Sequence, residues 1–278
     1  MDKMKENTNI KTENQAENEG RFDAFVGLPP INYNEIYLGD SFELCERVPA
    51  KTVDLILEDM PYNTTACEWD VKIDLQLYWE TRLRILKPTG VICLTASQPF
   101  TSELVMSNKK LFKYEWIWEK TQSRGHLLAY KQPMRKHESI LIFSEGQTYN
   151  YLLQDKPKKD IRPHSISGKA GVYNNEDANQ KETRKIPLDK KMPDTILKWA
   201  NEQKTDHPTQ KPVGLFEYLI RTYTNEGDLV FDGFGGSGTT AVAAHKSNRN
   251  FIVIEKEEKY YKLATERLRN ERAQCRLF

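Results

Sequence analysis

The stretch LVFDGFGGSGTTAVAAHK, residues 229–246, combines an apolar run, a glycine-rich turn and a helical pattern. Its first residues predict a buried strand, and Thr239–Lys246 predicts a helix. Between the two, Gly233, Gly235 and Gly238 have the spacing G-x-G-x-x-G. Glycines at a strand-to-helix turn let the backbone approach a ligand closely, so the stretch predicts a nucleotide-binding unit of an α/β fold.

The next apolar run, Phe251–Ile254, ends in Glu255. An acid at the tip of that strand can accept hydrogen bonds from two ribose hydroxyls, which favours a nucleoside-containing cofactor over a purely structural turn. A nicotinamide dinucleotide and S-adenosylmethionine both satisfy this pattern. Only about 40 residues follow the glycine turn, enough for one strand and one helix. The N-terminal half must therefore supply the other strands, as in a circular permutation.

The rest of the chain alternates between strand and helix patterns, which is typical of an α/β fold. We predict a Rossmann-like, circularly permuted mixed sheet with helices on both faces. The predicted strands cover residues 36–38, 53–57, 91–95, 114–118, 137–143, 229–231 and 251–254. The predicted helices cover residues 75–86, 102–107, 212–224, 239–246 and 259–272. The first of these helices is expected to stop before Pro88-Thr89-Gly90, ahead of the strand at residue 91.

Residues 145–205 interrupt this alternation, because they are polar, rich in Lys, Asn and Asp, and contain several Gly and Pro residues. A long segment without clear elements in a compact α/β chain is usually functional or mobile, so we interpret it as an insertion. Residues 1–20 have the composition of a disordered polar tail. Residues 21–144 and 206–278 are then predicted to be two halves of one domain.

The composition favours an ordered protein of a reducing compartment. A hydrophobic content of 38%, with 13 Tyr, 11 Phe and 5 Trp, can bury a sizeable core. No apolar run is long enough to cross a membrane, and the polar N-terminus is no signal peptide. The four cysteines, Cys45, Cys67, Cys93 and Cys275, include no C-x-x-C pair. This argues against a zinc site and a disulfide framework, so we expect a cytoplasmic protein without a metal.

A second stretch, LILEDMPYNTT at residues 55–65, ends a buried strand in an unusual way. Its apolar residues are followed by two carboxylates and then by Met60-Pro61-Tyr62. Packing alone gives no reason for an acid, a rigid turn and an aromatic ring in succession. The stretch therefore predicts a reactive site.

Three motifs occur in a characteristic order: DMPY at residues 59–62, HPTQKP at residues 207–212 and DGFGGSGTT at residues 232–240. In this order they resemble the β class of amino-group DNA methyltransferases, which have the catalytic motif first, a recognition region next and the cofactor motif last. The resemblance covers residues 34–270 apart from the middle of the chain. It implies the fold of S-adenosylmethionine-dependent methyltransferases, with residues 145–205 as the target-recognition region.

The resemblance implies that Asp59, Met60, Pro61 and Tyr62 act on an adenine flipped out of duplex DNA. The exocyclic amine of adenine is a poor nucleophile, because its lone pair is delocalised into the ring. The Asp59 carboxylate and the backbone carbonyl of Met60 would accept its two N–H groups, and Tyr62 would stack on the base. The family usually has Asp-Pro-Pro-Tyr, and Met60 keeps the carbonyl without the restricted φ of proline. Glu58 is expected to lie outside the site.

The same resemblance places S-adenosylmethionine over the glycine turn. Glu255 is expected to bind the ribose hydroxyls, and Asp40 the adenine amino group. Thr209 and Lys211 are expected to face the methionine carboxylate, and Asp59 borders the cofactor. The remaining contacts to the cofactor are expected from Phe231, Asp232, Gly233, Gly235, Gly236 and Ser237.

The charge is unevenly distributed, although the net charge is only +1. Residues 101–200 hold 19 Lys and Arg against 12 Asp and Glu, whereas residues 1–100 hold 10 against 17. Such a basic region is compatible with a surface that faces phosphates, and we expect the DNA face on residues 120–136 and 156–191. Gln and Arg are side-chain types that read base edges, although a phosphate contact is commoner. The expected DNA-binding side chains are Lys120, Gln122, Arg124, Lys131, Arg135 and Lys136.

Asp at the first position of the catalytic motif favours adenine N6, because family members that modify cytosine N4 usually carry Ser there. An N4-cytosine methyltransferase is the nearest alternative. RNA and protein-amide methyltransferases are less consistent, because they usually place the glycine loop before the catalytic motif. A nicotinamide oxidoreductase leaves residues 59–62 unexplained, and a DNA-binding protein with an inactive methylase fold would not need them. Besides double-stranded DNA, the resemblance is compatible with a homodimer and a cognate restriction endonuclease, which no pattern here tests.

Overall fold

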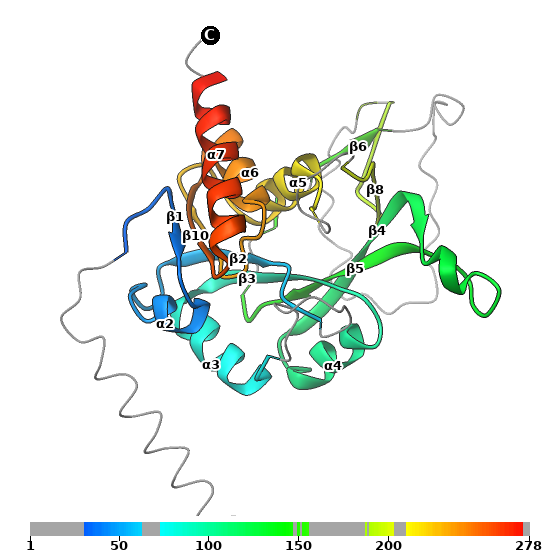
Figure 1. Cartoon of the computed structure of the whole chain (residues 1–278), viewed down its shortest axis with the longest axis horizontal. Helices are drawn as coiled ribbons and strands as arrows, with labels where there is room; N and C mark the ends of the chain where they lie inside the picture. Colours follow the sequence, from blue (N-terminus) through cyan, green and yellow to red (C-terminus); the bar gives the residue numbers. More distant parts are fainter. Residues whose placement is uncertain are drawn as a thin grey trace, which may run out of the picture.

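In a computed structural model, one eight-stranded mixed sheet runs through the molecule and helices cover both of its faces (Figure 1). The structure describes residues 31–62, 73–146, 149–150, 152–155, 187, 189–202 and 210–274. The strands are β1 (Glu35–Leu38), β2 (Val53–Glu58), β3 (Leu86–Ala96), β4 (Phe112–Arg124), β5 (Arg135–Phe143), β6 (Gln154–Asp155), β7 (Lys190–Lys191), β8 (Ile196–Trp199), β9 (Leu229–Asp232) and β10 (Asn250–Glu255). The helices are α2 (Ser41–Cys45), α3 (Leu75–Ile85), α4 (Phe100–Ser107), the 3-10 helix η1 (His126–Leu128), α5 (Val213–Tyr223), α6 (Thr239–Lys246) and α7 (Glu258–Gln274).

The order of strands in the sheet is β1-β10-β9-β2-β3-β5-β4-β8. The first five are parallel neighbours, and β5 runs antiparallel to both β3 and β4. Strands from the two ends of the chain meet where Leu55 pairs with Val230 and Ile56 with Phe231. This confirms the predicted Rossmann-like, circularly permuted mixed sheet. The segments that follow β2 and β9 consequently emerge at the same edge of the sheet.

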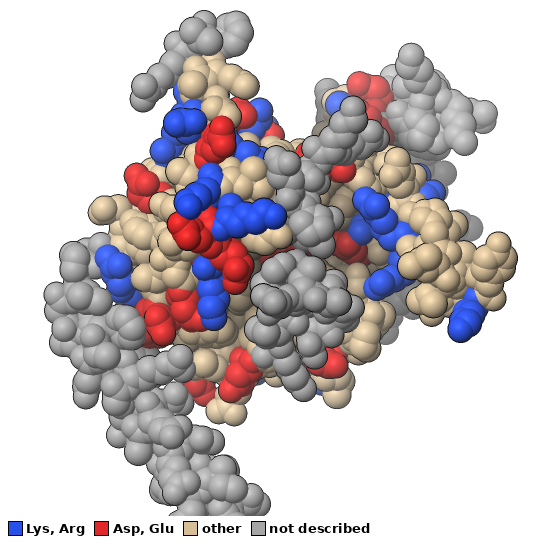
Figure 2. Space-filling model, viewed as in Figure 1, with Lys and Arg blue, Asp and Glu red and all other residues tan. Residues whose placement is uncertain are grey.

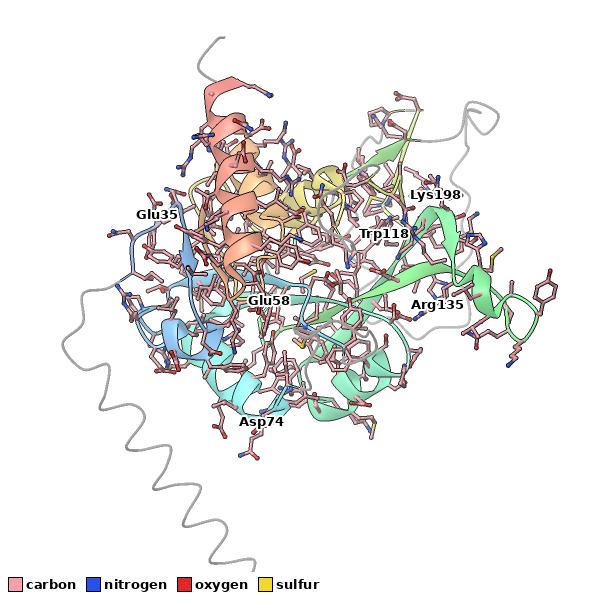
Figure 3. All side chains as sticks on the ribbon, viewed as in Figure 1. Glu35, Glu58, Asp74, Trp118, Arg135 and Lys198 are labelled. Atoms are coloured by element: carbon pink, nitrogen blue, oxygen red, sulfur yellow. The ribbon has the colours of Figure 1, made fainter. Side chains whose placement is uncertain are left out.

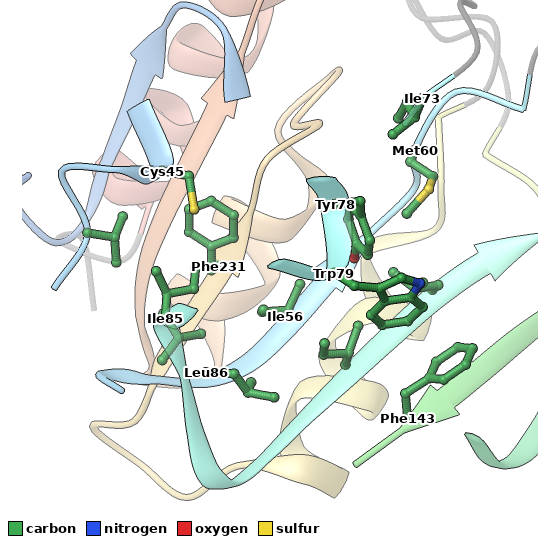
Figure 4. Packing of buried hydrophobic residues seen from close by; sticks show 14 of the residues in the cluster. Cys45, Ile56, Met60, Ile73, Tyr78, Trp79, Ile85, Leu86, Phe143 and Phe231 are labelled. Atoms are coloured by element: carbon green, nitrogen blue, oxygen red, sulfur yellow. The ribbon is translucent and has the colours of Figure 1, made fainter. Parts of the chain in front are cut away.

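Alternate residues of the central strands face two separate cores. On one face, Ile56 and Phe231 pack with Tyr78 and Trp79 of α3, and Met60 joins this cluster (Figure 4). On the other face lie the apolar residues of α5, α6 and α7. No helix among the described residues has the length and apolar character needed to cross a bilayer.

The strand after α3 begins earlier than expected. The prediction that Pro88-Thr89-Gly90 precedes the strand is wrong, because β3 starts at Leu86 directly after the helix. The pairing with β2 shifts register here: Val53 pairs with Leu86, but Leu55 already pairs with Val91. The irregularity leaves Pro88 outside the paired positions, which suits a residue that has no N–H to donate.

Among the described residues, three strands, β6, β7 and β8, lie within the region predicted as an insertion, and one of them joins the main sheet. β8 pairs in parallel with the outer part of β4, from Ile117–Ile196 to Lys120–Trp199, and so forms the last strand of the main sheet. Its sequence is short and follows a polar run, which gives no strand signal by itself. The boundaries at residues 145 and 205 stay a prediction.

A buried ion pair lies beneath the glycine loop. Arg82 of α3 and Glu58 of β2 are both fully buried, with Nε of Arg82 donating to Oε1 of Glu58 at 2.9 Å. The same Oε1 accepts the backbone N–H of Gly233 at 2.9 Å, and Oε2 accepts the hydroxyl of Tyr78 at 2.7 Å. Arg82 also donates to the hydroxyl of Ser41 in α2. Glu58 therefore connects β2, α3 and the glycine loop at the centre of the molecule (Figure 3).

Replacing Arg82 by Met should destabilise the protein strongly, because it leaves the Glu58 carboxylate buried without a cation. We expect the free energy of unfolding to fall by about 3–5 kcal/mol, measured by chemical denaturation. The control Arg269→Met removes a side chain that is 76% exposed and should change this free energy by less than about 0.5 kcal/mol. Equal effects of the two substitutions would contradict the role of the ion pair.

Candidate active site

The side chain of Asp59 lies directly after β2 and is held by three donors. Its Oδ1 accepts the hydroxyl of Tyr62 at 2.6 Å and the hydroxyl of Thr95, and its Oδ2 accepts Nζ of Lys211 at 2.6 Å. Thr95 belongs to β3 and Lys211 lies just before α5, so three segments orient this carboxylate. A carboxylate held this way is preorganised as a hydrogen-bond acceptor.

Lys211 is the centre of a chain of alternating charges. Its ammonium contacts the Asp59 carboxylate and lies 3.3 Å from Oε2 of Glu138, which in turn is paired with Lys120. Burial lowers the pKa of Lys211, but the two carboxylates outweigh it and hold this pKa above the ordinary lysine value. Burial likewise raises the pKa of Glu138, but Lys211 and Lys120 bring it below the usual range. Lys211 and Glu138 therefore stay charged at neutral pH.

The glycine loop connects β9 to α6, and its glycines are required by the packing of the protein itself. A Cβ at Gly233 would lie 2.8 Å from Oε1 of Glu58 and closer still to Arg82, and one at Gly235 would lie 2.4 Å from Val253. Gly238 has φ +76°, which side chains rarely adopt. Protein atoms occupy the space that a Cβ at Gly233 or Gly235 would need, while both residues border a cavity.

Asp232 ends β9 and is buried at the base of this loop. Its carboxylate accepts the N–H of Phe234 at 2.9 Å and the hydroxyl of Thr240. Burial raises the pKa of Asp232 to about 8, with further repulsion from Glu58. The carboxyl thus carries a proton through part of the neutral range and shapes the loop as a hydrogen-bonding group.

Two more acids lie at the ends of strands beside the loop. Glu255 is the last residue of β10 and accepts the N–H groups of Gly236 at 2.6 Å and Glu257 at 2.8 Å, and burial raises its pKa. Asp40 caps α2 by accepting the N–H of Phe42 at 2.9 Å, and its second oxygen contacts Lys256 at 3.3 Å. Both carboxylates border the same cavity.

That cavity has a volume of about 570 Å³ and joins the glycine loop to the catalytic motif. This volume is within the range of sites for small molecules. The predicted residues that line it are Asp40, Asp59, Met60, Pro61, Tyr62, Lys120, Arg124, Arg135, Lys211, Asp232, Gly233, Gly235, Gly236, Ser237 and Glu255. An acid at the tip of β10, a glycine loop at a helix start and a buried cation all fit a nucleoside that carries an amino-acid group.

Some predicted residues lie elsewhere. Phe231 is buried in the core, its ring 5.1 Å from the guanidinium carbon of Arg82, and it does not border the cavity. The side chain of Met60 is also buried in the core, although the residue borders the cavity. Thr209 lies outside the described residues.

The expected DNA-binding residues follow the outer part of β4 and β5. Arg124 and Arg135 pair with each other in the sheet and border the cavity. Lys120 is engaged with Glu138, and the ammonium of Lys136 lies 3.2 Å from Glu119. The other two predicted residues, Gln122 and Lys131, are exposed and do not line the cavity.

No motif singles out two acids that support the site. Glu58 does not line the cavity, as expected, but its carboxylate accepts the amide of Gly233 in the glycine loop. Glu138 lies in the predicted strand at residues 137–143 and matches no motif. The only signal for either acid is a carboxylate next to the apolar residues of a strand, which indicates a buried partner.

Comparison with known proteins identifies the family. The family model described as DNA methylase matches residues 53–266. The methyltransferase M2.LlaDCHI of Lactococcus lactis subsp. cremoris is 30% identical over 82% of this chain and 87% of its own length. The adenine methyltransferase YhdJ of Escherichia coli is 28% identical over 87% of this chain and 86% of its own length. The methyltransferase M.HpaI of Haemophilus parainfluenzae is 28% identical over 84% of this chain and 73% of its own length.

Solved structures agree with this comparison. M1.HpyAVI in complex with S-adenosylmethionine superimposes with a TM-score of 0.57 and 25% identity, over 84% of this chain and 99% of that one. The cytosine-N4-specific PvuII methyltransferase superimposes with a TM-score of 0.61 and 17% identity, over 86% of this chain and 87% of that one. At this identity the likeness shows the fold alone. The chain belongs to the DNA methylase family. It is an S-adenosylmethionine-dependent DNA methyltransferase with a Rossmann-like fold.

The raised pKa of Asp232 predicts a pH-dependent stability. Its value in an unfolded chain is about 3.9, so between about pH 4 and pH 8 the folded protein binds a proton that the unfolded chain has lost. The stability from this proton is complete below about pH 4 and is lost as pH rises through about 8. In denaturation series, the free energy of unfolding of the wild type relative to Asp232→Asn should fall across this window. A difference that does not change with pH would contradict the raised pKa.

Lys211→Met tests what the buried ammonium binds. Because Lys211 contacts Asp59 and Glu138 and borders the cavity, we expect both the rate of methyl transfer and the affinity for S-adenosylhomocysteine to fall, the rate by roughly 10- to 100-fold. The exposed control Lys262→Met should change neither. The affinity for 5′-methylthioadenosine, which lacks the amino-acid group, should stay unchanged. An unchanged affinity for S-adenosylhomocysteine would show that Lys211 serves Asp59 and Glu138 and not the methionine carboxylate.

Proposed function

We propose that this enzyme methylates the N6 amine of adenine at a specific site in duplex DNA, with the target base turned out of the helix. The observation that carries the proposal is the Asp59 carboxylate, held by Tyr62, Thr95 and Lys211 at the cavity that also contains the glycine loop. The relative YhdJ is named as a DNA adenine methyltransferase, which supports the choice of base.

The chemistry assigns a role to each residue of the catalytic motif. The bound cofactor supplies an electrophilic methyl group. As the amine nitrogen attacks, it becomes tetrahedral and gains positive charge, so an anion and a carbonyl dipole beside it stabilise the transition state selectively. Asp59 accepts one N–H of the amine and the carbonyl of Met60 accepts the other. Neither residue forms a covalent bond to the base.

Tyr62 is suited to stack on the target base. Its hydroxyl is anchored on Asp59, and its ring packs against Phe100 with centroids 5.4 Å apart and planes tilted by 33°. The ring is partly exposed and borders the cavity. A base placed against it would gain stacking free energy and bring its exocyclic amine towards the carboxylate.

For the cofactor, we propose that Glu255 binds the ribose, Asp40 the adenine amino group, and Lys211 and Thr209 the methionine carboxylate. Glu255, Asp40 and Lys211 border the cavity. So do the glycine-loop residues Asp232, Gly233, Gly235, Gly236 and Ser237. Glu255 now accepts two backbone amides. A carboxylate has about four acceptor positions, so ribose hydroxyls can be added to these bonds.

The proposal also covers target recognition, location in the cell and protein partners. We propose that the outer part of β4 and β5, with residues 145–205, recognises the target sequence, and that the enzyme works in the cytoplasm. A cognate restriction endonuclease fits relatives that carry the name Type II methyltransferase. A second copy of the chain is the other proposed partner.

The central test compares Asp59→Asn with the wild type. We expect methyl transfer to slow by roughly 10²–10³-fold, because the amide cannot replace the anion beside the reacting nitrogen. The measurement incubates protein, cofactor and unmethylated DNA, then quantifies modified nucleosides by mass spectrometry. The control Glu35→Gln changes an exposed acid on β1 and should retain the wild-type rate.

Two results would overturn parts of the proposal. A folded, cofactor-binding Asp59→Asn variant with the wild-type rate would exclude Asp59 from the reaction. If the wild type forms N4-methylcytosine and no N6-methyladenine, the base assignment moves to cytosine.

A further inference from the structure

The hairpin of β4 and β5 extends far beyond the rest of the sheet. Ala96, the last residue of β3, is level with Ser139 of β5, which pairs with Ile117 of β4. β4 continues from there to Arg124, about 20 Å further at a rise of about 3.3 Å per residue. We call residues 118–138 the arm, which is visible in green in Figure 1.

The arm is stiff at its base. β8 pairs with it up to Lys120, and the indole N–H of Trp118 donates to the carbonyl of Trp199 at 3.0 Å. Lys120 is paired with Glu138 on the opposite strand of the arm. Because parallel strands carry the catalytic motif at their carboxyl ends, the arm projects on the same side as the active site. Arg124 and Arg135 accordingly border its cavity.

The tip of the arm exposes large apolar side chains. Leu127 is 98% exposed and Tyr130 is fully exposed, with Leu128 at 47% and Met134 at 41%. Among the large hydrophobic residues that the structure describes, Leu127 and Tyr130 are the two most exposed. These side chains make no contribution to the core, so a cluster of them at the end of a projecting hairpin indicates a surface that is covered by a partner.

The charge around the tip identifies the partner as DNA. Residues 120–137 contain five Lys or Arg and no Asp or Glu. Figure 2 shows Lys and Arg along this part of the molecule, with uncharged and positively charged surface together at its outer end. Glu119 and Glu138 lie at the base of the arm, where they pair with Lys136 and Lys120. An apolar tip with cations and no acids next to it matches a duplex, which presents phosphates outside and stacked bases inside. A second copy of this chain would have to bring like charges together.

We propose that Leu127 and Tyr130 insert into the duplex beside the target base and fill the space that the base leaves. Unstacking and unpairing a base is costly, and apolar side chains wedged between base steps compensate for it. The arm projects on the side of the sheet where Asp59 lies, and we place Leu127, Tyr130 and Asp59 on the same nucleotide. The proposal rests on the base flipping of the proposed function, whichever base is methylated.

The test uses the double variant Leu127→Ser/Tyr130→Ser on two duplexes that contain the target site, mapped beforehand by methylation-sensitive sequencing. One duplex is fully matched, and the other has an abasic site opposite the target base, which is then already unpaired. On the matched duplex, the single-turnover rate should fall by at least about tenfold, as expected for lost stacking. On the abasic duplex the loss should be less than about threefold.

Two further variants sharpen the result. Met106→Ser removes an apolar side chain that is 67% exposed on α4, which runs back towards the opposite edge of the sheet, and should retain the wild-type rate on both duplexes. Tyr130→Phe keeps the aromatic ring and should also retain the wild-type rate on both duplexes. Affinity for S-adenosylhomocysteine, unchanged in all variants, shows that the fold is intact.

Each other outcome rejects the wedge. No loss on the matched duplex, or the same loss on both duplexes, would show that the tip is not needed to open the helix. A wild-type dimer that dissociates in the double variant, measured by sedimentation, would make the tip a contact between copies. If the wild type itself methylates no DNA, the proposed function fails first, and the comparison of variants is not reached.

Discussion

The buried pair of Glu58 and Arg82 is the interaction on which the site depends. Burying two charges is costly unless each is fully hydrogen-bonded, and here both are. Glu58 accepts Arg82, Tyr78 and the amide of Gly233, while Arg82 also binds Ser41. One carboxylate at the end of β2 thereby holds the cofactor loop that follows β9. The next residue in the chain, Asp59, is the carboxylate proposed to act in catalysis, so its position is tied to that of the loop.

This coupling gives the permuted chain a rigid site from distant segments. β2 and β9 pair directly, so the catalytic motif and the glycine loop emerge at one edge although they are far apart in sequence. Lys211 then joins Asp59 to Glu138 on β5, and Glu138 joins Lys120 on β4. Alternating charges thus link the cofactor side of the sheet to the arm. Glu138 lies between two cations that lower its pKa, so it needs no proton to remain buried at neutral pH.

The sequence predicted the elements well, because apolar periodicity and turn residues mark most of them locally. It predicted that the N-terminal half completes the sheet, because too few residues follow the glycine turn to form the other strands. It could not predict which partner a buried group takes. Gly233 and Gly235 border the cavity, but Glu58 and Val253 also occupy the space that a Cβ at these positions would need. Glu138 has no motif, since its role depends on a lysine more than seventy residues away that only the sheet brings near.

The arm shows why the net charge of the chain does not identify its partner. A net charge of +1 arises because acids and bases balance over the whole chain, yet residues 120–137 contain only positive charge. Attraction to phosphates acts over a distance of about 8–10 Å at ordinary salt concentrations, so a duplex at the outer part of the arm responds to the cations there rather than to acids elsewhere in the chain. Electrostatic attraction can align the helix along the arm, but it is independent of base and cannot open a base pair. That step requires apolar side chains at the tip, and the arm's stiff base keeps them at a constant distance from Asp59.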